Sequence, residues 1–228
     1  MRNVALSEQA KIEAFLKNSV LGGLPPETLT ELAGLADSLL FEAGETLFIE
    51  GDPADHFFLV QRGQSKLFKT SRSGRNLTFT LATAGDAVNG LAMSLDHYYL
   101  TAQAITKLVV LRVDRKVYQG FQTRHPSIAI RLVAVLAQVM SREHERLLEV
   151  ISENAEYRLI HFLRVLVRKF GPRISLTREE LAEFVGLTTE TTIRLFAQLK
   201  QRGIIAPSAE RGSIVISDPQ TLDEYRIL

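Results

Sequence analysis

Residues 177–203 read TREELAEFVGLTTETTIRLFAQLKQRG, and this stretch decides the fold of the C-terminal third of the chain. Thr177 and Glu180 have the spacing of a capping box, so a helix is predicted to begin there. The inner face of this helix is predicted to contain Leu181, Ala182 and Val185. A buried side along one short helix requires further elements to pack against it.

Gly186 supplies a tight turn after this helix, and Thr188 is predicted to cap a second helix that runs to about residue 202. The apolar contacts of the second helix are predicted to include Ile193, Phe196, Ala197 and Leu199. Residues 204–206 and 213–217 are predicted to form a hairpin that turns through 209–212. Two helices joined by a short glycine turn and followed by a hairpin are typical of a winged helix-turn-helix.

The second of these helices has the chemistry of a DNA recognition helix, which reads base edges with its N-terminal residues. The predicted base-reading residues are Thr189, Glu190, Ile193 and Arg194. Arg194 can donate to guanine O6 and N7, and Glu190 can accept from the N4 amine of cytosine. The predicted contacts to the DNA backbone are Thr188, Thr191, Lys200 and Arg202. The alternatives are a solvated helix face and a winged helix that binds protein partners.

Upstream, the pattern changes at about Leu39 to short β-rich runs separated by glycine turns. These runs are residues 46–49, 56–60, 65–70, 77–81, 100–105 and 108–113. Their regular spacing predicts an antiparallel sandwich or barrel. Two short helices are predicted before it, within residues 7–36.

A long helix is predicted after Pro126, with a seam of residues three or four apart. The predicted seam is Leu132, Leu136, Val139, Glu143, Leu147 and Val150. Its partner is predicted to be the same helix of a second copy about a two-fold axis, the alternative being the chain's own barrel. Asn154 follows as a cap and candidate hinge, and a further helix is predicted over 156–170.

Composition excludes several classes of protein. The 228 residues are 46% hydrophobic, which suits a folded protein with its own core. The absence of cysteine excludes disulfides, thiolate metal sites and a cysteine-ligated iron–sulfur cluster. We expect no membrane association, because no apolar stretch is long enough to span a bilayer. The segment from Arg158 to Arg211 contains ten Lys and Arg and five Asp and Glu, which suggests that any contact with a polyanion lies in the C-terminal third.

With these residues in place, nearly the whole chain resembles the CRP/FNR family of transcription regulators. The residues that carry the resemblance are GETLFIEGDPADHFFLVQRG at 44–63 and GLTTETTIR at 186–194. The resemblance implies an α+β fold: an N-terminal cyclic-nucleotide-binding-type antiparallel β-roll over 1–125, a dimerisation helix over 126–153 and a winged helix-turn-helix over 154–228. It matches Glu190 and Arg194 to the glutamate and arginine that read G·C pairs.

The resemblance further implies a cytoplasmic homodimer whose partner is double-stranded DNA with palindromic half-sites. RNA polymerase would be a further partner if the protein is an activator. Cyclic AMP is not expected as the effector, because cyclic-nucleotide binders in this family carry Gly-Glu and Arg-Ser pairs where this chain has Gly90-Leu91 and Leu100-Thr101. A buried phosphate without its guanidinium would be poorly compensated.

The effector pocket is predicted to consist of Gly90, Leu91, Met93, Leu100, Thr101, Met140, Glu143 and His144. Residues 91–104 look similar to the nitric-oxide-responsive, haem-associated branch of the family, so haem is a candidate cofactor with His97 as its candidate ligand. A small organic or carboxylate ligand and constitutive activity are alternatives. A cupin-like metal enzyme is a more remote alternative, since the barrel offers no histidine pair at strand spacing with a carboxylate.

Overall fold

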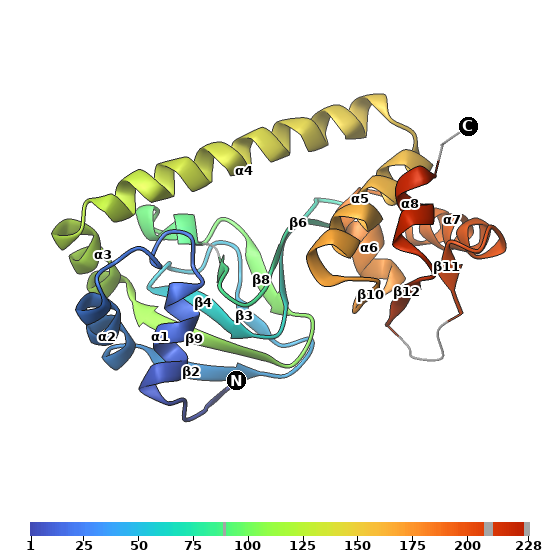
Figure 1. Ribbon diagram of the computed structural model, residues 1–228. Helices are drawn as coiled ribbons and strands as arrows, with labels where there is room; N and C mark the ends of the chain where they lie inside the picture. The colour runs from blue at the N-terminus through green and yellow to red at the C-terminus, as the bar shows by residue number, and fades with distance from the viewer. Residues whose placement is uncertain (89, 208–211, 226–228) are drawn as a thin grey trace. The chain divides into compact units, whose positions relative to one another are not determined.

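The computed structural model describes residues 1–88, 90–207 and 212–225 (Figure 1). The chain divides into two compact units. The first consists of Met1–Thr70 and Thr78–Met140, and the second consists of Ser71–Leu77 and Ser141–Leu228. Each unit buries its own set of apolar side chains.

The first unit is built from helices and two β-sheets. Its helices are α1 Glu8–Leu16, α2 Pro26–Gly34 and α3 Arg115–Arg124, with the 3-10 helix η1 Gly90–Ser94. One sheet has the order β1-β2-β9-β4-β7, with strands Arg2–Asn3, Asp37–Phe41, Leu108–Asp114, His56–Arg62 and Ala87–Val88. The other has the order β3-β8-β5-β6, with strands Thr46–Phe48, Thr101–Ala104, Ser65–Thr70 and Asn76–Ala82. Neighbouring pairs such as β2 with β9 and β5 with β8 are antiparallel.

Apolar side chains from both sheets meet in the core of the first unit. Leu59 and Val110 of the first sheet and Ala102 of the second belong to one buried cluster. Gly63 makes a corner of this roll with φ +92°, and a Cβ there would lie 2.3 Å from the carbonyl oxygen of Lys107. This corner therefore requires glycine, both because its φ is positive and because the backbone at Lys107 lies too close for a side chain.

The sequence patterns predicted most of these elements with small errors at their ends. The runs at 56–60, 65–70 and 108–113 are strands β4, β5 and β9, and the two helices expected within residues 7–36 are α1 and α2. The patterns did not predict β1, β2, β7, η1 or α3. Two-residue strands are too short to show alternation. Helix α3 was missed because it begins directly after β9, with Asp114 as its N-cap.

The long helix is confirmed as α4, Ser127–Ser152, but its predicted seam is wrong in part. Leu132 is half-buried and packs against the core of the first unit, and Val139 and Glu143 are also half-buried. The exposed large apolar residues of α4 are Ile130, Val133, Leu136, Met140, Leu147, Leu148, Val150 and Ile151. The predicted seam mixed a covered face with an open one, because periodicity does not show which neighbour covers a face.

The second unit contains the remaining helices and a small sheet. Its elements are α5 Ala155–Phe170, β10 Arg173–Ile174, α6 Arg178–Val185, α7 Thr189–Gln201, β11 Ile205–Ala206, β12 Ile214–Ile216 and α8 Pro219–Glu224. The sheet order is β10-β12-β11, so β11 and β12 form the predicted hairpin. Residues 209–211 of its predicted turn lie outside the described residues. Helix α8 was not predicted; it begins with Asp218 as N-cap and Pro219 in its first turn.

Candidate DNA interface and effector region

The predicted helix-turn-helix is present in the second unit. Thr177 and Glu180 form the capping box of α6: the Glu180 amide donates to Thr177 Oγ1 at 3.1 Å, and the Thr177 amide donates to the Glu180 carboxylate at 2.7 Å. Gly186 ends α6 in the left-handed conformation, with φ +65° and ψ +37°. Thr188 then caps α7, since its Oγ1 accepts from the Thr191 amide at 3.2 Å. The local signals of the sequence therefore form the motif that they predicted.

The buried face of α7 differs from the predicted one. It consists of Thr192, Leu195, Phe196 and Leu199. Ile193 is 49% exposed and Ala197 is also exposed, so their predicted apolar contacts are wrong. The prediction favoured apolar residue types and passed over Thr192, whose hydroxyl donates to the Thr188 carbonyl oxygen at 3.0 Å. A threonine can be buried in a helix when its hydroxyl is satisfied in this way.

The outer face of α7 carries the predicted base-reading residues. Glu190, Ile193 and Arg194 are exposed, and Thr189 is half-buried at the start of the helix. Within the described part of the chain, Glu190 and Arg194 make no side-chain hydrogen bond or ion pair. Their donors and acceptors are therefore available to a ligand that approaches this face.

The side chains predicted to contact the DNA backbone differ in how many contacts they make within the protein. The Thr188 hydroxyl donates to Thr191 Oγ1 at 3.0 Å, so both side chains take part in the cap of α7. Lys200 is exposed in the last turn of α7. Arg202 pairs with Glu156 at 3.1 Å and lies over the ring of Tyr225, 5.3 Å from its centroid. Lys200 is therefore the less restrained of the two cations.

Two arginines that the sequence did not single out bind the end of α6. Arg146 of α4 donates to the Phe184 carbonyl oxygen at 2.7 Å, and Arg158 of α5 donates to the Val185 carbonyl oxygen at 3.1 Å. A backbone acceptor has no side-chain signature, so no motif points to it. The two helices that precede the helix-turn-helix carry three arginines each, so the sequence does not show which of them reach the end of α6.

Three of the residues predicted to line the effector pocket are buried or hydrogen-bonded within the first unit. Met93 and Leu100 are 1% and 6% exposed and belong to the core. Thr101 Oγ1 accepts from the Glu50 amide at 3.0 Å. Gly90 and Leu91 lie in η1. Met140 is largely exposed at the end of the first unit, whereas Glu143 and His144 belong to the second.

The candidate haem ligand His97 is exposed, and its backbone forms an antiparallel bridge with Pro53. The next residue, Tyr98, is buried and donates its hydroxyl to the His56 carbonyl oxygen at 2.6 Å. Burial raises the pKa of Tyr98 to about 12. Among the residues that the structure describes, no three His, Cys, Asp or Glu gather where they could hold a metal ion.

Residues 39–125 match the cyclic nucleotide-binding domain family, and residues 157–225 match the Crp-like helix-turn-helix domain family. The chain is 27% identical over 220 residues to the CRP-like cAMP-activated global transcriptional regulator of Mycobacterium tuberculosis, covering 92% of this chain and 97% of that protein. It is 26% identical over 218 residues to the nitrogen fixation regulation protein FixK of Bradyrhizobium diazoefficiens, covering 92% and 90%. The structure of FixK2 from Bradyrhizobium japonicum matches with a TM-score of 0.73 at 25% identity, over 82% of this chain and 96% of that one. The chain belongs to the CRP/FNR family.

Membership in the CRP/FNR family confirms the predicted fold class and excludes the enzyme alternative. The second matched domain is a Crp-like helix-turn-helix, one relative is named as a global transcriptional regulator, and the other is named as a regulation protein. The relatives do not share one signal in their names, since one is named as cAMP-activated and the other for nitrogen fixation. Family membership therefore does not name the effector of this chain.

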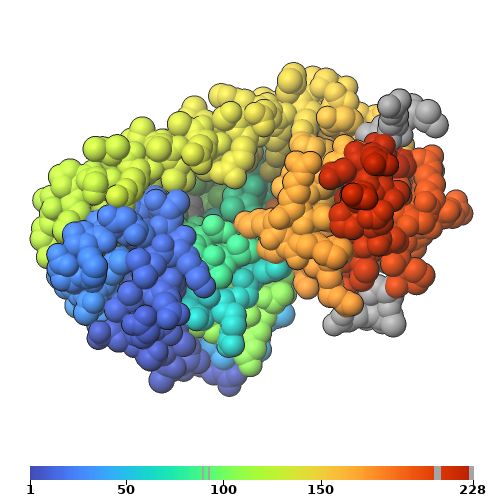
Figure 2. All heavy atoms as spheres, viewed as in Figure 1, coloured from blue at the N-terminus to red at the C-terminus, as the bar shows by residue number. Residues whose placement is uncertain are grey.

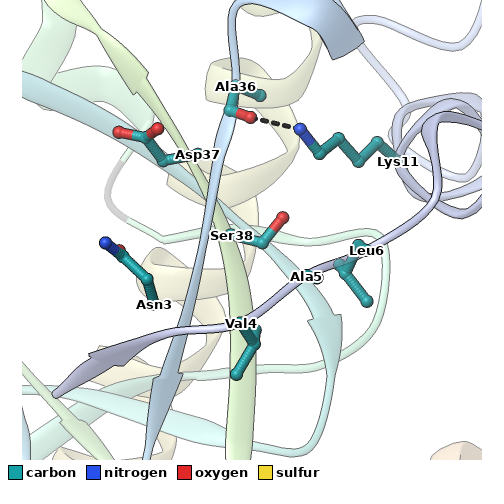
Figure 3. A pocket seen from close by; sticks show the side chains of 8 residues that line it. All are labelled: Asn3, Val4, Ala5, Leu6, Lys11, Ala36, Asp37 and Ser38. Carbon is teal, nitrogen blue, oxygen red and sulfur yellow. Dashed lines mark hydrogen bonds between the residues drawn. The ribbon is translucent and has the colours of Figure 1, made fainter.

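The first unit, called the sensor unit below after the role proposed for it, also contains a pocket of about 290 Å³ that is lined by Asn3, Val4, Ala5, Leu6, Lys11, Ala36, Asp37 and Ser38 (Figure 3). The Lys11 ammonium donates to the carbonyl oxygens of Ala33 and Ala36 at 3.2 and 2.6 Å. The predicted effector residues do not line this pocket. Lys11 serves there to hold the end of α2.

None of the helices in the described ranges is long and apolar enough to cross a membrane. The long helix α4 carries charged residues such as Arg142, Glu143 and Glu145 in its middle.

Proposed function

We propose that this CRP/FNR regulator is a homodimer that reads a palindromic DNA site with two copies of α7 and responds to an effector other than cyclic AMP. The outer face of α7 carries the proposal, because Glu190 and Arg194 are exposed there and engage none of the described side chains. Those two residue types suit cytosine and guanine edges in the major groove. The protein would act in the cytoplasm, with RNA polymerase as a further partner if it activates transcription.

Dimerisation is supported by the exposed residues of α4, which repeat at alternating spacings of three and four. The repeat consists of Ile130, Val133, Ala137, Met140, His144, Leu147 and Ile151. These are the a and d positions of a coiled-coil heptad. Leu147 is 58% and Ile151 is 75% exposed, and the outer side of α4 is open in the space-filling view (Figure 2). The same helix of a second copy would cover this heptad seam about a two-fold axis.

The proposed effector follows from the residues that occupy the sensor unit. Leu100 is buried in the core and Thr101 bonds to the Glu50 amide, so neither offers the cation that a buried phosphate needs. We favour a small organic or carboxylate effector over haem, because His97 is exposed. A haem group would need an enclosed apolar site around its axial histidine.

The DNA-binding proposal is tested by selecting duplexes from a random pool and comparing the wild type with Arg194→Ala in gel shifts. We expect a palindrome whose half-sites lie about one turn, roughly 34 Å, apart. Arg194→Ala should lose about 1 to 3 kcal/mol and relax discrimination at one G·C pair. Arg168→Ala is the matched control, because it removes an exposed arginine from α5. Equal binding by the wild type and Arg194→Ala would overturn the assignment of Arg194.

The effector proposal is tested by the absorption spectrum of protein that is expressed with haem supplied. A colourless protein supports the organic effector, and a screen of small carboxylates by thermal shift then identifies its class. A Soret band that His97→Ala removes contradicts this preference and establishes haem sensing through His97.

A further inference from the structure

The last carbonyl groups of α6, directly before the turn of the helix-turn-helix, are held by side chains from two other helices. A helix end leaves carbonyl oxygens without partners in the helix itself, and cations near that end are favourable. Arg146 of α4 donates to Phe184 O at 2.7 Å, and Arg158 of α5 donates to Val185 O at 3.1 Å. These contacts all lie within the second unit.

Arg146 is fixed in place rather than loosely attached to the surface. Its side chain is 23% exposed and lies 3.8 Å from the Glu143 carboxylate. Burial lowers the pKa of the guanidinium, and Glu143 and Glu149 oppose this shift. An arginine stays charged under such a shift, so it donates to Phe184 O at any ordinary pH.

The same segment of α4 also carries part of the heptad seam. Leu147 is 58% exposed, whereas its neighbour Arg146 is largely covered and contacts α6. Successive residues of a helix point about 100° apart, so the two side chains occupy different sides of α4. One turn of helix therefore faces both the proposed second copy and the end of α6.

Arg146 bypasses the connection at Asn154, the candidate hinge. Asn154 caps α5 by accepting from the Tyr157 amide at 2.8 Å, and the covalent path from α4 to α6 runs through it. Glu149 of α4 gives a second contact across this connection, to His161 of α5 at 2.6 Å. The Arg146 contact differs because it reaches α6 itself, next to the turn that places α7.

We propose that Arg146 is a positioning residue that sets the orientation of the helix-turn-helix relative to the dimer seam, and thereby the half-site spacing that the dimer prefers. This inference rests on the proposed homodimer on palindromic DNA. Arg158 provides an internal comparison, because it binds the neighbouring carbonyl of the same helix end but comes from α5, beyond Asn154. Loss of Arg158 should loosen the end of α6. Loss of Arg146 should loosen the end of α6 and also remove the contact between α6 and α4.

The test uses the selected palindrome with its spacer changed by one and two base pairs in either direction. Wild-type affinity should fall by about tenfold or more away from the optimum, comparable to the effect of a mismatched base pair. For Arg146→Ala, the ratio of the affinity for the optimal spacer to the affinity for an altered spacer should approach one. Arg158→Ala should bind more weakly at every spacer and keep the wild-type optimum.

A merely structural role for Arg146 predicts a uniform loss of affinity with an unchanged spacing preference, and that result would overturn the inference. Arg146→Lys retains one charged donor and should restore part of the preference; it replaces Arg146→Ala if the alanine variant does not fold. Thermal unfolding and sedimentation check that each variant is a folded dimer. If the wild type binds no palindrome at any spacer, the proposed function fails instead.

Discussion

The proposed DNA-reading region on α7 and the predicted effector region of the first unit place their predicted residues in opposite environments. On α7, Glu190 and Arg194 are exposed and without partners among the described residues. In the sensor unit, Met93 and Leu100 are core residues, and Thr101 bonds to the Glu50 amide. A surface that reads DNA consists of exposed polar groups whose hydrogen-bonding capacity is unused in the free protein. The residues around an effector also have to stabilise their own domain. Exposure therefore identifies the first kind of site better than the second.

The largest effect should come from Leu147→Glu, because the reading region recognises a palindrome only as a pair. Burying a charge without a partner costs several kcal/mol, so two glutamates in the heptad seam should separate the copies. Sedimentation should then show a monomer, and affinity for the palindrome should fall to that for one half-site. Gln138→Glu, at an exposed position off the seam, is the control and should remain dimeric. A dimeric Leu147→Glu variant would exclude this seam.

The next prediction tests whether a predicted pocket residue acts as core. Leu100→Ala should lower the free energy of unfolding by about 2 to 5 kcal/mol, since it removes buried methyl groups and leaves a cavity. Leu95→Ala removes the same atoms from a side chain that is 47% exposed, and its cost should stay within about 0.5 kcal/mol. Urea unfolding with an unchanged m-value measures both. If both variants lost a similar amount of free energy of unfolding, Leu100 would not act as a core residue.

A smaller effect is expected from removing the N-cap of α7. Thr188→Ala removes the cap of α7 and should cost about 1 kcal/mol of stability. Thr188→Ser keeps the capping oxygen and should cost much less. Because the cap also orders the first turn of α7, gel shifts should show weaker DNA binding by the alanine variant alone. Unchanged DNA binding by Thr188→Ala would separate the cap from DNA reading.

The smallest effect concerns the phosphate contacts. Lys200→Ala should weaken binding about equally on all sequences and reduce the slope of log affinity against log salt by about 1. Lys116→Ala removes an exposed lysine of α3 in the sensor unit and should leave the slope unchanged. A salt titration of fluorescence anisotropy measures both slopes. A sequence-dependent loss in Lys200→Ala would assign Lys200 to base reading instead.

Local signals predicted the DNA-binding part well. The capping box at Thr177, the turn at Gly186 and the cap at Thr188 act over three or four residues, so they can be recognised from neighbours in the sequence. The prediction failed where burial depends on distant neighbours. Ile193 and Ala197 were assigned to the inner face of α7 because they are apolar, while the structure buries Thr192 there.

The sequence by itself predicted most of the longer elements, the helix-turn-helix and the chemistry of the residues proposed to read DNA, because capping, turn glycines and periodicity are short-range effects. Only the tertiary structure decided which side of α4 is covered, that Leu100 is core, and that Arg146 and Arg158 bind the end of α6. A periodic pattern shows that a face is apolar but does not name its neighbour. A backbone carbonyl oxygen is the same in every residue, so its partner appears only once the chain is folded.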